Sequence, residues 1–92
     1  MVDDEVAFLW DNRPGENVDH IKRHGMTTEL WERVFHQASK RRADKDDATI
    51  EVAEGRIDRR LYRIVYELLS GRAVRPIEIY PISGYPINRR AL

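Results

Sequence analysis

Residues 59–72 read RRLYRIVYELLSGR and contain the longest apolar stretch of the chain, at residues 61–69. β-Branched and aromatic residues dominate the first part of this stretch, and they pack better on a pleated, half-buried surface than in a helix. A Ser-Gly pair at residues 70–71 then interrupts it as a turn would. A second apolar stretch, PIEIY, follows at residues 76–80. The two stretches are predicted to form neighbouring antiparallel strands at the centre of a small sheet.

The chain before this pair begins with a predicted strand and a predicted helix. Residues 6–10 (VAFLW) are short and apolar, which suits a first strand. The helix is expected to run from about Pro14 to His24. Proline is tolerated in a first helical turn, and Gly25 suits the position after the last one.

A second helix and a further strand are expected next. Thr27 or Thr28 caps this helix, which runs to about Gln37. Its apolar residues recur at helical spacing as Leu30, Trp31, Val34 and Phe35. Residues 40–47 are polar apart from one alanine, so they are predicted to be an exposed loop or a frayed extension of the helix. Residues 49–53 alternate with period two, as a half-buried strand does, and the Glu-Gly pair at 54–55 is a turn signal.

The tail after the second central strand contains Tyr-Pro-Ile twice, at residues 80–82 and 85–87. Prolines cannot donate to a sheet ladder, so a regular central strand is not expected there. We expect an ordered turn and an edge segment with docked aromatic side chains. The resulting order is β-α-α-β-β-β. It describes an α+β domain in which the two helices of the first half pack on one face of an antiparallel sheet.

Length and composition limit the classes of protein that fit. The 92 residues are expected to form one domain, residues 1–92, with a thin core. The sequence has no cysteine, which excludes disulfides and thiolate sites. No stretch approaches the ~20 apolar residues of a membrane span, and the N-terminus lacks a secretory signal pattern. We therefore expect a soluble cytoplasmic protein with no membrane partner and no cofactor.

The net charge of zero conceals an asymmetry between the two parts of the chain. Residues 1–55 carry eight Lys/Arg and thirteen Asp/Glu, a balance of −5, whereas residues 56–92 carry eight arginines and three acids, a balance of +5. Arginine suits planar contacts with phosphate or carboxylate groups. The arginine-rich part therefore suits a nucleic acid backbone or an acidic protein, and equally suits internal pairing with the acidic part.

Three histidines are candidates for chemistry: His20, His24 and His36. His20 and His24 are four residues apart and share one face of the first predicted helix. Two imidazoles do not make a metal site without further ligands, and no metal is expected here. Histidine titrates near neutral pH and can transfer protons in catalysis. The alternative is structural, with His24 helping to end the helix and His20 packing against the sheet.

The central strand offers a second group of polar residues. Arg63 and Glu67 share one face of the strand, and Tyr66 lies on the other. Both faces are largely apolar, so the sequence does not decide which one meets the helices. On an open face, Arg63 and Glu67 either form cross-strand ion pairs, or Arg63 holds a scissile phosphate while a carboxylate or tyrosine lies near the nucleophilic 2′-hydroxyl.

Several short segments form a longer pattern. They are FLWD at residues 8–11, ENVDHI at residues 16–21, RHGMT at residues 23–27 and Val-Phe at residues 34–35. A Gly-Arg pair at residues 55–56 and a long apolar strand with a tyrosine near its end follow. Taken together, this pattern resembles the BrnT toxin family over nearly the whole chain.

The resemblance implies a fold like that of the RelE-type ribonuclease toxins. Those proteins block translation by metal-independent RNA cleavage and are neutralised by a tightly bound antitoxin protein. Under this hypothesis the catalytic candidates come from the first helix and the central strand: His20, His24, Arg63, Tyr66 and Glu67. The candidates for binding RNA are arginines of the second part of the chain: Arg56, Arg59, Arg60, Arg89 and Arg90.

Two other interpretations stay open from the sequence. A non-catalytic relative would use the arginine-rich part to bind a protein or a nucleic acid in a regulatory role. A homodimer would use an exposed sheet edge or the Tyr-Pro-Ile tail. The opposite charges of the two parts of the chain would then suit head-to-tail contacts.

Overall fold

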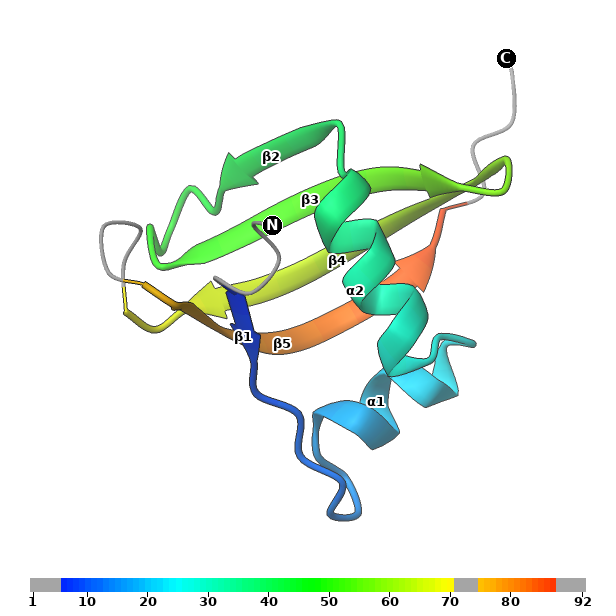
Figure 1. Cartoon of the computed structure of the whole chain (residues 1–92), viewed down its shortest axis with the longest axis horizontal. Coiled ribbons are helices and arrows are strands. Elements are labelled where there is room, and N and C mark those ends of the chain that lie inside the picture. The colour runs from blue at the N-terminus through cyan, green and yellow to red at the C-terminus, as the bar shows by residue number, and fades with distance from the viewer. Residues whose placement is uncertain (1–5, 71–74, 88–92) are drawn as a thin grey trace.

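The computed structural model describes residues 6–70 and 75–87, and in these residues two helices pack on a five-stranded sheet (Figure 1). The elements in chain order are β1 (Val6–Phe8), α1 (Asn17–Arg23), α2 (Thr28–Gln37), β2 (Lys40–Ala43), β3 (Ile50–Ile57), β4 (Arg60–Leu68) and β5 (Ile77–Pro86). The predicted α+β class is confirmed. Among the described residues, no helix is long and apolar enough to cross a membrane.

The sequence predicts the ends of α2 correctly but not the start of α1. α2 has the predicted extent, and the Thr27 side chain caps it by accepting from the Leu30 backbone N–H at 3.1 Å. α1 is shorter than predicted because it begins at Asn17. Glu16 occupies its N-cap position without a side-chain cap hydrogen bond, so the first turn expected after Pro14 is not helical.

The strand order is β1-β5-β4-β3-β2, and neighbouring strands are antiparallel except for β1, which runs parallel to β5. The prediction of a purely antiparallel sheet is wrong for this pair. Strands that pair are usually close in sequence, but β1 joins the strand farthest from it, over Val6–Phe8 and Ile77–Ile79. Such a long-range pairing leaves no local pattern.

An additional strand, β2, lies where the sequence predicts an exposed loop or a helix extension. Lys40–Ala43 pair with residues 51–54 of β3 at the outer edge of the sheet, and all four residues are exposed. Pairing at an edge needs only backbone groups, and charged side chains protect such an edge from other chains. β3 is also longer than predicted, because Glu54 and Gly55 continue the strand and do not turn it.

β5 is a continuous ten-residue strand, although the sequence predicts a turn and an edge segment for its second half. Pro81 fits because its backbone faces α1, where the Asn17 side chain donates to the Pro81 carbonyl oxygen at 2.9 Å. β1 pairs with β5 only up to Ile79. Beyond that residue no strand among the described residues lies on the outer side of β5, so the missing backbone N–H of Pro81 breaks no hydrogen bond between strands. The register with β4 also shifts in this region, through a β-bulge.

The helices cover the face of the sheet that carries Ile64 and Tyr66, which decides the orientation that the sequence leaves open. Both residues are buried in one core with Ile21 of α1 and Trp31 of α2. Because side chains alternate along a strand, Arg63 lies on the other, open face of β4.

α2 lies close to the sheet at positions where the strands carry glycine. The Trp31 indole N–H donates to the Ser83 carbonyl oxygen at 3.0 Å, and a Cβ on Gly84 would lie 2.7 Å from Trp31 Cδ1. Gly55 of β3 is similar, since a Cβ there would lie 3.0 Å from the Ala38 Cα. Two positions without a side chain therefore set how closely α2 packs on the sheet.

Gly84→Ala is expected to lower the free energy of unfolding by about 1–3 kcal/mol, because the added methyl group overpacks the space next to Trp31. Urea unfolding followed by tryptophan fluorescence measures the change. Ser83→Ala is the control, since this side chain lies on the open face, and it should change stability by less than about 0.5 kcal/mol. Wild-type stability of Gly84→Ala would show that α2 can move away without cost.

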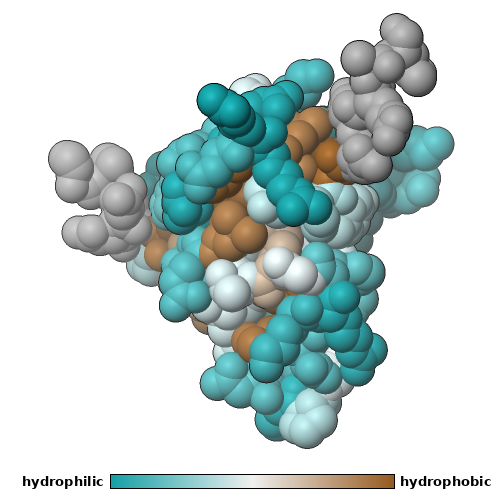
Figure 2. Space-filling view, turned by 90° about the vertical axis from the view of Figure 1, so that its right-hand side faces the viewer, coloured by the Kyte–Doolittle hydropathy of each residue, from teal (hydrophilic) through white to brown (hydrophobic). Residues whose placement is uncertain are grey.

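The β3–β4 hairpin turns at Asp58 and Arg59, which have positive φ angles of 50° and 72°. Two-residue hairpin turns with this geometry favour Asn-Gly or Asp-Gly. A non-glycine residue such as Arg59 in a left-handed conformation costs about 1–2 kcal/mol. Arg56 supports the turn, because its Nη1 donates to the Arg59 carbonyl oxygen at 3.2 Å. The end of the molecule that carries this hairpin is mostly hydrophilic, with smaller hydrophobic patches (Figure 2).

Arg59→Gly is expected to raise the free energy of unfolding by about 1 kcal/mol, because glycine adopts the left-handed conformation without steric cost. Urea unfolding tests this directly. The neighbouring change Arg60→Gly is the control and should lower stability by about 0.5–1 kcal/mol, since this residue lies in a regular strand. Equal effects of the two changes would contradict a strained turn.

Candidate functional site

A line of polar side chains crosses the open face of the sheet. Lys40 of β2 lies opposite Glu54 of β3. Glu54 lies opposite Arg63 of β4, which in turn lies opposite Tyr85 of β5. Residues directly opposite each other point to the same face of a sheet. At the β5 end, the ring centroids of Tyr85 and His24 of α1 are 6.2 Å apart. We call these five residues, Lys40, Glu54, Arg63, Tyr85 and His24, the polar row.

Arg63 is the centre of the polar row and is held from both sides. Its Nε and Nη2 atoms donate to Oε2 of Glu54 at 2.9 and 2.7 Å. Hydrogen bonding to the Tyr85 side chain and to Glu54 raises the pKa of Arg63. The ion pair is partly exposed, with 31% of the Arg63 side chain and 14% of the Glu54 side chain accessible. A ligand that reaches the open face therefore meets a fixed guanidinium.

Two imidazoles lie at the α1 end of the polar row. The ring centroids of His20 and His24 are 5.2 Å apart. His24 is the exposed C-cap residue of α1, as the structural interpretation expects, whereas His20 is half-buried. Through Tyr85, the structure brings three of the predicted catalytic candidates to one region: His20, His24 and Arg63.

The position of α1 depends on the buried Asn17 side chain. Its Oδ1 accepts from the Asp11 backbone N–H at 2.8 Å, and its Nδ2 donates to the Leu9 and Pro81 carbonyl oxygens at 3.0 and 2.9 Å. A helix of seven residues is not stable alone. These bonds tie it to β5 and to the segment after β1, and they hold its histidines beside the sheet.

Tyr66 lies on the opposite face of the sheet from the polar row. The residue is 1% exposed, and its hydroxyl donates to Oε1 of the buried Glu51 at 2.6 Å and accepts from Nη1 of Arg41 at 3.1 Å. Burial, and after it the hydrogen bond to Glu51, raises the pKa of Tyr66 to about 12. The sheet separates Tyr66, a predicted catalytic candidate, from Arg63, and the two side chains lie on opposite faces of β4 as the alternation of the strand predicts.

Glu67 shares the open face with Arg63 but lies in a different part of it. In the register it stands opposite Ile50 of β3 and Tyr80 of β5. Val65 lies between Arg63 and Glu67 on the same face of β4. Glu67 is thus outside the polar row.

The predicted RNA-binding arginines that the structure describes gather at the β3–β4 hairpin. Arg56, Arg59 and Arg60 are all exposed there. Arg56 lies two residues beyond Glu54 on the open face of β3, so the hairpin arginines begin next to the polar row on the same face of the sheet. Arg89 and Arg90 lie outside the described residues.

Three members of the polar row were missed by reasoning from the sequence: Lys40, Glu54 and Tyr85. Lys40 falls in the predicted loop, and Glu54 in the predicted turn. A signal for Glu54 was present, because the alternation of β3 continues to Ile57. Tyr85 stands among prolines, which hid the strand that carries it.

Within the part of the chain that the structure describes, no group of three or more His, Cys, Asp or Glu side chains is placed to hold a metal ion. Comparisons with protein-family models, curated proteins and solved structures found no match to this chain.

Tyr66→Phe removes the hydroxyl that Glu51 and Arg41 share. At neutral pH the free energy of unfolding should fall by about 1–3 kcal/mol, because Glu51 loses a buried hydrogen-bond donor. The pKa of Tyr66 is raised from 10.0 to about 12 by folding. The wild type should therefore lose stability between these pH values, by up to about 1.4 kcal/mol per pH unit.

The Tyr66→Phe protein lacks this titration, so the two stabilities should converge as the pH rises from 10.0 to about 12. Urea unfolding across this range measures both proteins. Parallel pH profiles would contradict the assignment of the raised pKa to Tyr66. The remaining tyrosines titrate in both proteins and cancel in the comparison.

Proposed function

We propose that the protein is a metal-independent endoribonuclease of the toxin type, which acts in the cytoplasm and is neutralised by an antitoxin protein. The polar row supports this most, because an imidazole lies at its β5 end, next to a phenol and a guanidinium of the open face. RNA cleavage without a metal needs a base, an acid and a positive group at the phosphate. The row offers a suitable side chain for each role.

In the proposed reaction the 2′-hydroxyl of RNA is the nucleophile. His24 or His20 takes the proton of this hydroxyl while the bond between O2′ and phosphorus forms. Arg63 stabilises the charge that develops on the phosphorane oxygens. The bond between phosphorus and O5′ then breaks, and the leaving oxygen takes a proton from the other imidazole or from Tyr85. The products are a 2′,3′-cyclic phosphate and a 5′-hydroxyl end.

The hairpin arginines give the proposal a second support. Arg56, Arg59 and Arg60 are exposed at the end of the two strands that carry Glu54 and Arg63. Exposed arginines bind the phosphates of a nucleic acid whatever its sequence. They would hold the RNA near the row and leave the choice of cleavage site to other contacts.

Binding without cleavage is a second candidate function, and one observation favours it. Arg63 already donates two hydrogen bonds to Glu54, so its charge is compensated. In a binding module of this kind, the row and the hairpin would hold a nucleic acid or an acidic protein in a regulatory role. No proton transfer by the histidines would be needed.

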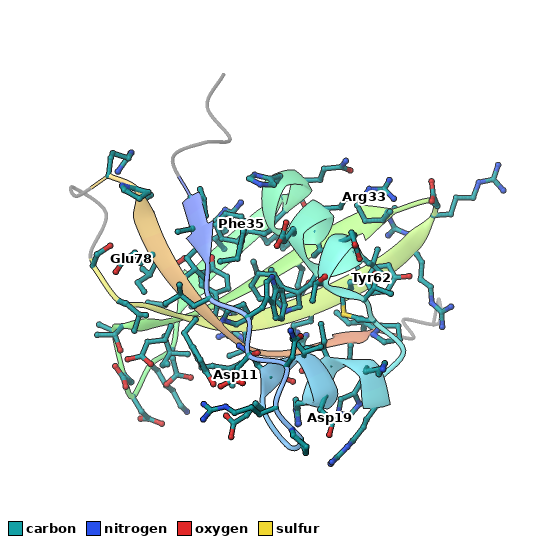
Figure 3. All side chains as sticks on the ribbon, turned by 60° about the horizontal axis from the view of Figure 1, so that its bottom comes forward. Asp11, Asp19, Arg33, Phe35, Tyr62 and Glu78 are labelled. Atoms are coloured by element: carbon teal, nitrogen blue, oxygen red, sulfur yellow. The ribbon has the colours of Figure 1, made fainter. Side chains whose placement is uncertain are left out.

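Cleavage of a single-stranded RNA oligonucleotide in excess EDTA tests the nuclease proposal, with detection of 2′,3′-cyclic phosphate ends by mass spectrometry. Arg63→Ala and His24→Asn should each lower the rate by on the order of 100-fold or more, as loss of a phosphate contact or a proton-transfer group does. The matched controls are Arg33→Gln and His36→Asn on α2, where Arg33 is exposed (Figure 3). Both controls should keep the wild-type rate.

Induced expression in a bacterial host gives a second readout of the same proposal. The wild type should arrest growth and bulk translation, and Arg63→Ala should relieve the arrest at equal protein level. Normal growth together with intact RNA in vitro would contradict the nuclease. Retained binding of a labelled oligonucleotide would then identify the protein as a binding module.

A further inference from the structure

The open face is hollowed at the β2 end of the polar row. The hollow has a volume of about 410 Å³ and is lined by Ser39, Lys40, Arg41, Arg42, Val52 and Glu54. In the register, Lys40 lies opposite Glu54, and Arg42 lies opposite Val52. The side chains of Lys40 and Arg42 therefore point to the open face, on the same side as Arg63.

The hollow carries a positive charge. Arg41 is engaged on the other face with Tyr66, but within residues 6–70 and 75–87 neither Lys40 nor Arg42 forms an ion pair. Both are exposed. Glu54 is the acid in the lining, and its carboxylate already accepts two hydrogen bonds from a guanidinium. An anion at the hollow thus meets two cations and a carboxylate whose charge is compensated.

We propose that this hollow binds the RNA phosphates next to the scissile one, so that the RNA strand crosses the sheet from β5 to β2. The inference rests on the proposed function, because it places the scissile phosphate at Arg63. Neighbouring strands are about 4.8 Å apart, which puts Lys40 two spacings, or about 10 Å, from Arg63 along the row. A short stretch of extended RNA spans this distance with its phosphates facing the cations.

A competing path would run along the strands toward the hairpin. That path is less suited to binding phosphates, because the acidic Asp58 lies among the hairpin arginines and Arg56 already donates to the Arg59 carbonyl oxygen. The hollow offers a recess with two cations that no described acid engages. The charge pattern therefore favours the path across the strands.

Fluorescence anisotropy with a labelled 2′-deoxy oligonucleotide, which lacks the nucleophile, measures this path. Lys40→Gln/Arg42→Gln should raise Kd by about tenfold or more and flatten the slope of log Kd against log salt by about 1.4, which is ~0.7 for each of two lost phosphate contacts. Arg59→Gln/Arg60→Gln removes the same charge at the hairpin and should have smaller effects. The Arg33→Gln control should change neither quantity.

A hairpin effect as large as the effect at the hollow would overturn the crossing path. Unchanged oligonucleotide binding by Lys40→Gln/Arg42→Gln would also overturn it. If this variant instead lost binding of a polyglutamate peptide, the hollow would serve an acidic protein. Circular dichroism and unfolding temperature establish that each variant is folded.

Cleavage of ribose RNA is scored separately, so the two proposals can fail independently. If the protein does not cleave RNA but Lys40→Gln/Arg42→Gln strongly weakens oligonucleotide binding, the path across the strands is supported and only the nuclease chemistry is contradicted. If Arg63→Ala abolishes cleavage but Lys40→Gln/Arg42→Gln does not change its rate at low RNA concentration, the nuclease proposal is supported and the path across the strands is contradicted.

Discussion

The packing of Trp31 against Gly84 is the constraint on which the rest of the structure depends. Trp31 is fully buried, and the rings of Phe8, Phe35 and Tyr66 surround it with centroids 5.9, 6.2 and 5.8 Å away. One side chain thereby joins β1, α2, β4 and β5. Aromatic pairs of this kind contribute about 0.5–1.5 kcal/mol beyond the area they bury, which matters in a domain with so thin a core.

The same contact also determines the open face. Side chains alternate along a strand, so holding Gly84 against Trp31 turns Tyr85 to the open face. Ile64 lies opposite Gly84 on the core side, and this register places Arg63 opposite Tyr85. A slip of one residue would turn the polar row into the core and the core residues to solvent. The same register of β4 and β5 therefore places the core residues on one face of the sheet and the candidate site on the other.

Local signals could be read from the sequence, and long-range pairing could not. The second helix carries its cap and its apolar stripe within a few residues, so α2 was predicted with its bounds. β2, the parallel contact of β1 and the full length of β5 depend on partners far along the chain. In the site, His20, His24 and Arg63 could be proposed from residue type alone. The burial of Tyr66 could not be predicted, because both faces of β4 are largely apolar and packing decides which side meets the helices.

The choice between cleavage and binding depends on how readily Arg63 leaves Glu54. The pair is partly exposed, and exposed ion pairs contribute only about 0–1 kcal/mol. A phosphate that replaces the carboxylate offers Arg63 the same planar, bidentate geometry. The released carboxylate lies directly opposite Lys40, so in the proposed complex Lys40 contacts both Glu54 and a phosphate at the hollow. Anion binding at β2 and the release of Arg63 for a phosphate are therefore coupled along one row of side chains.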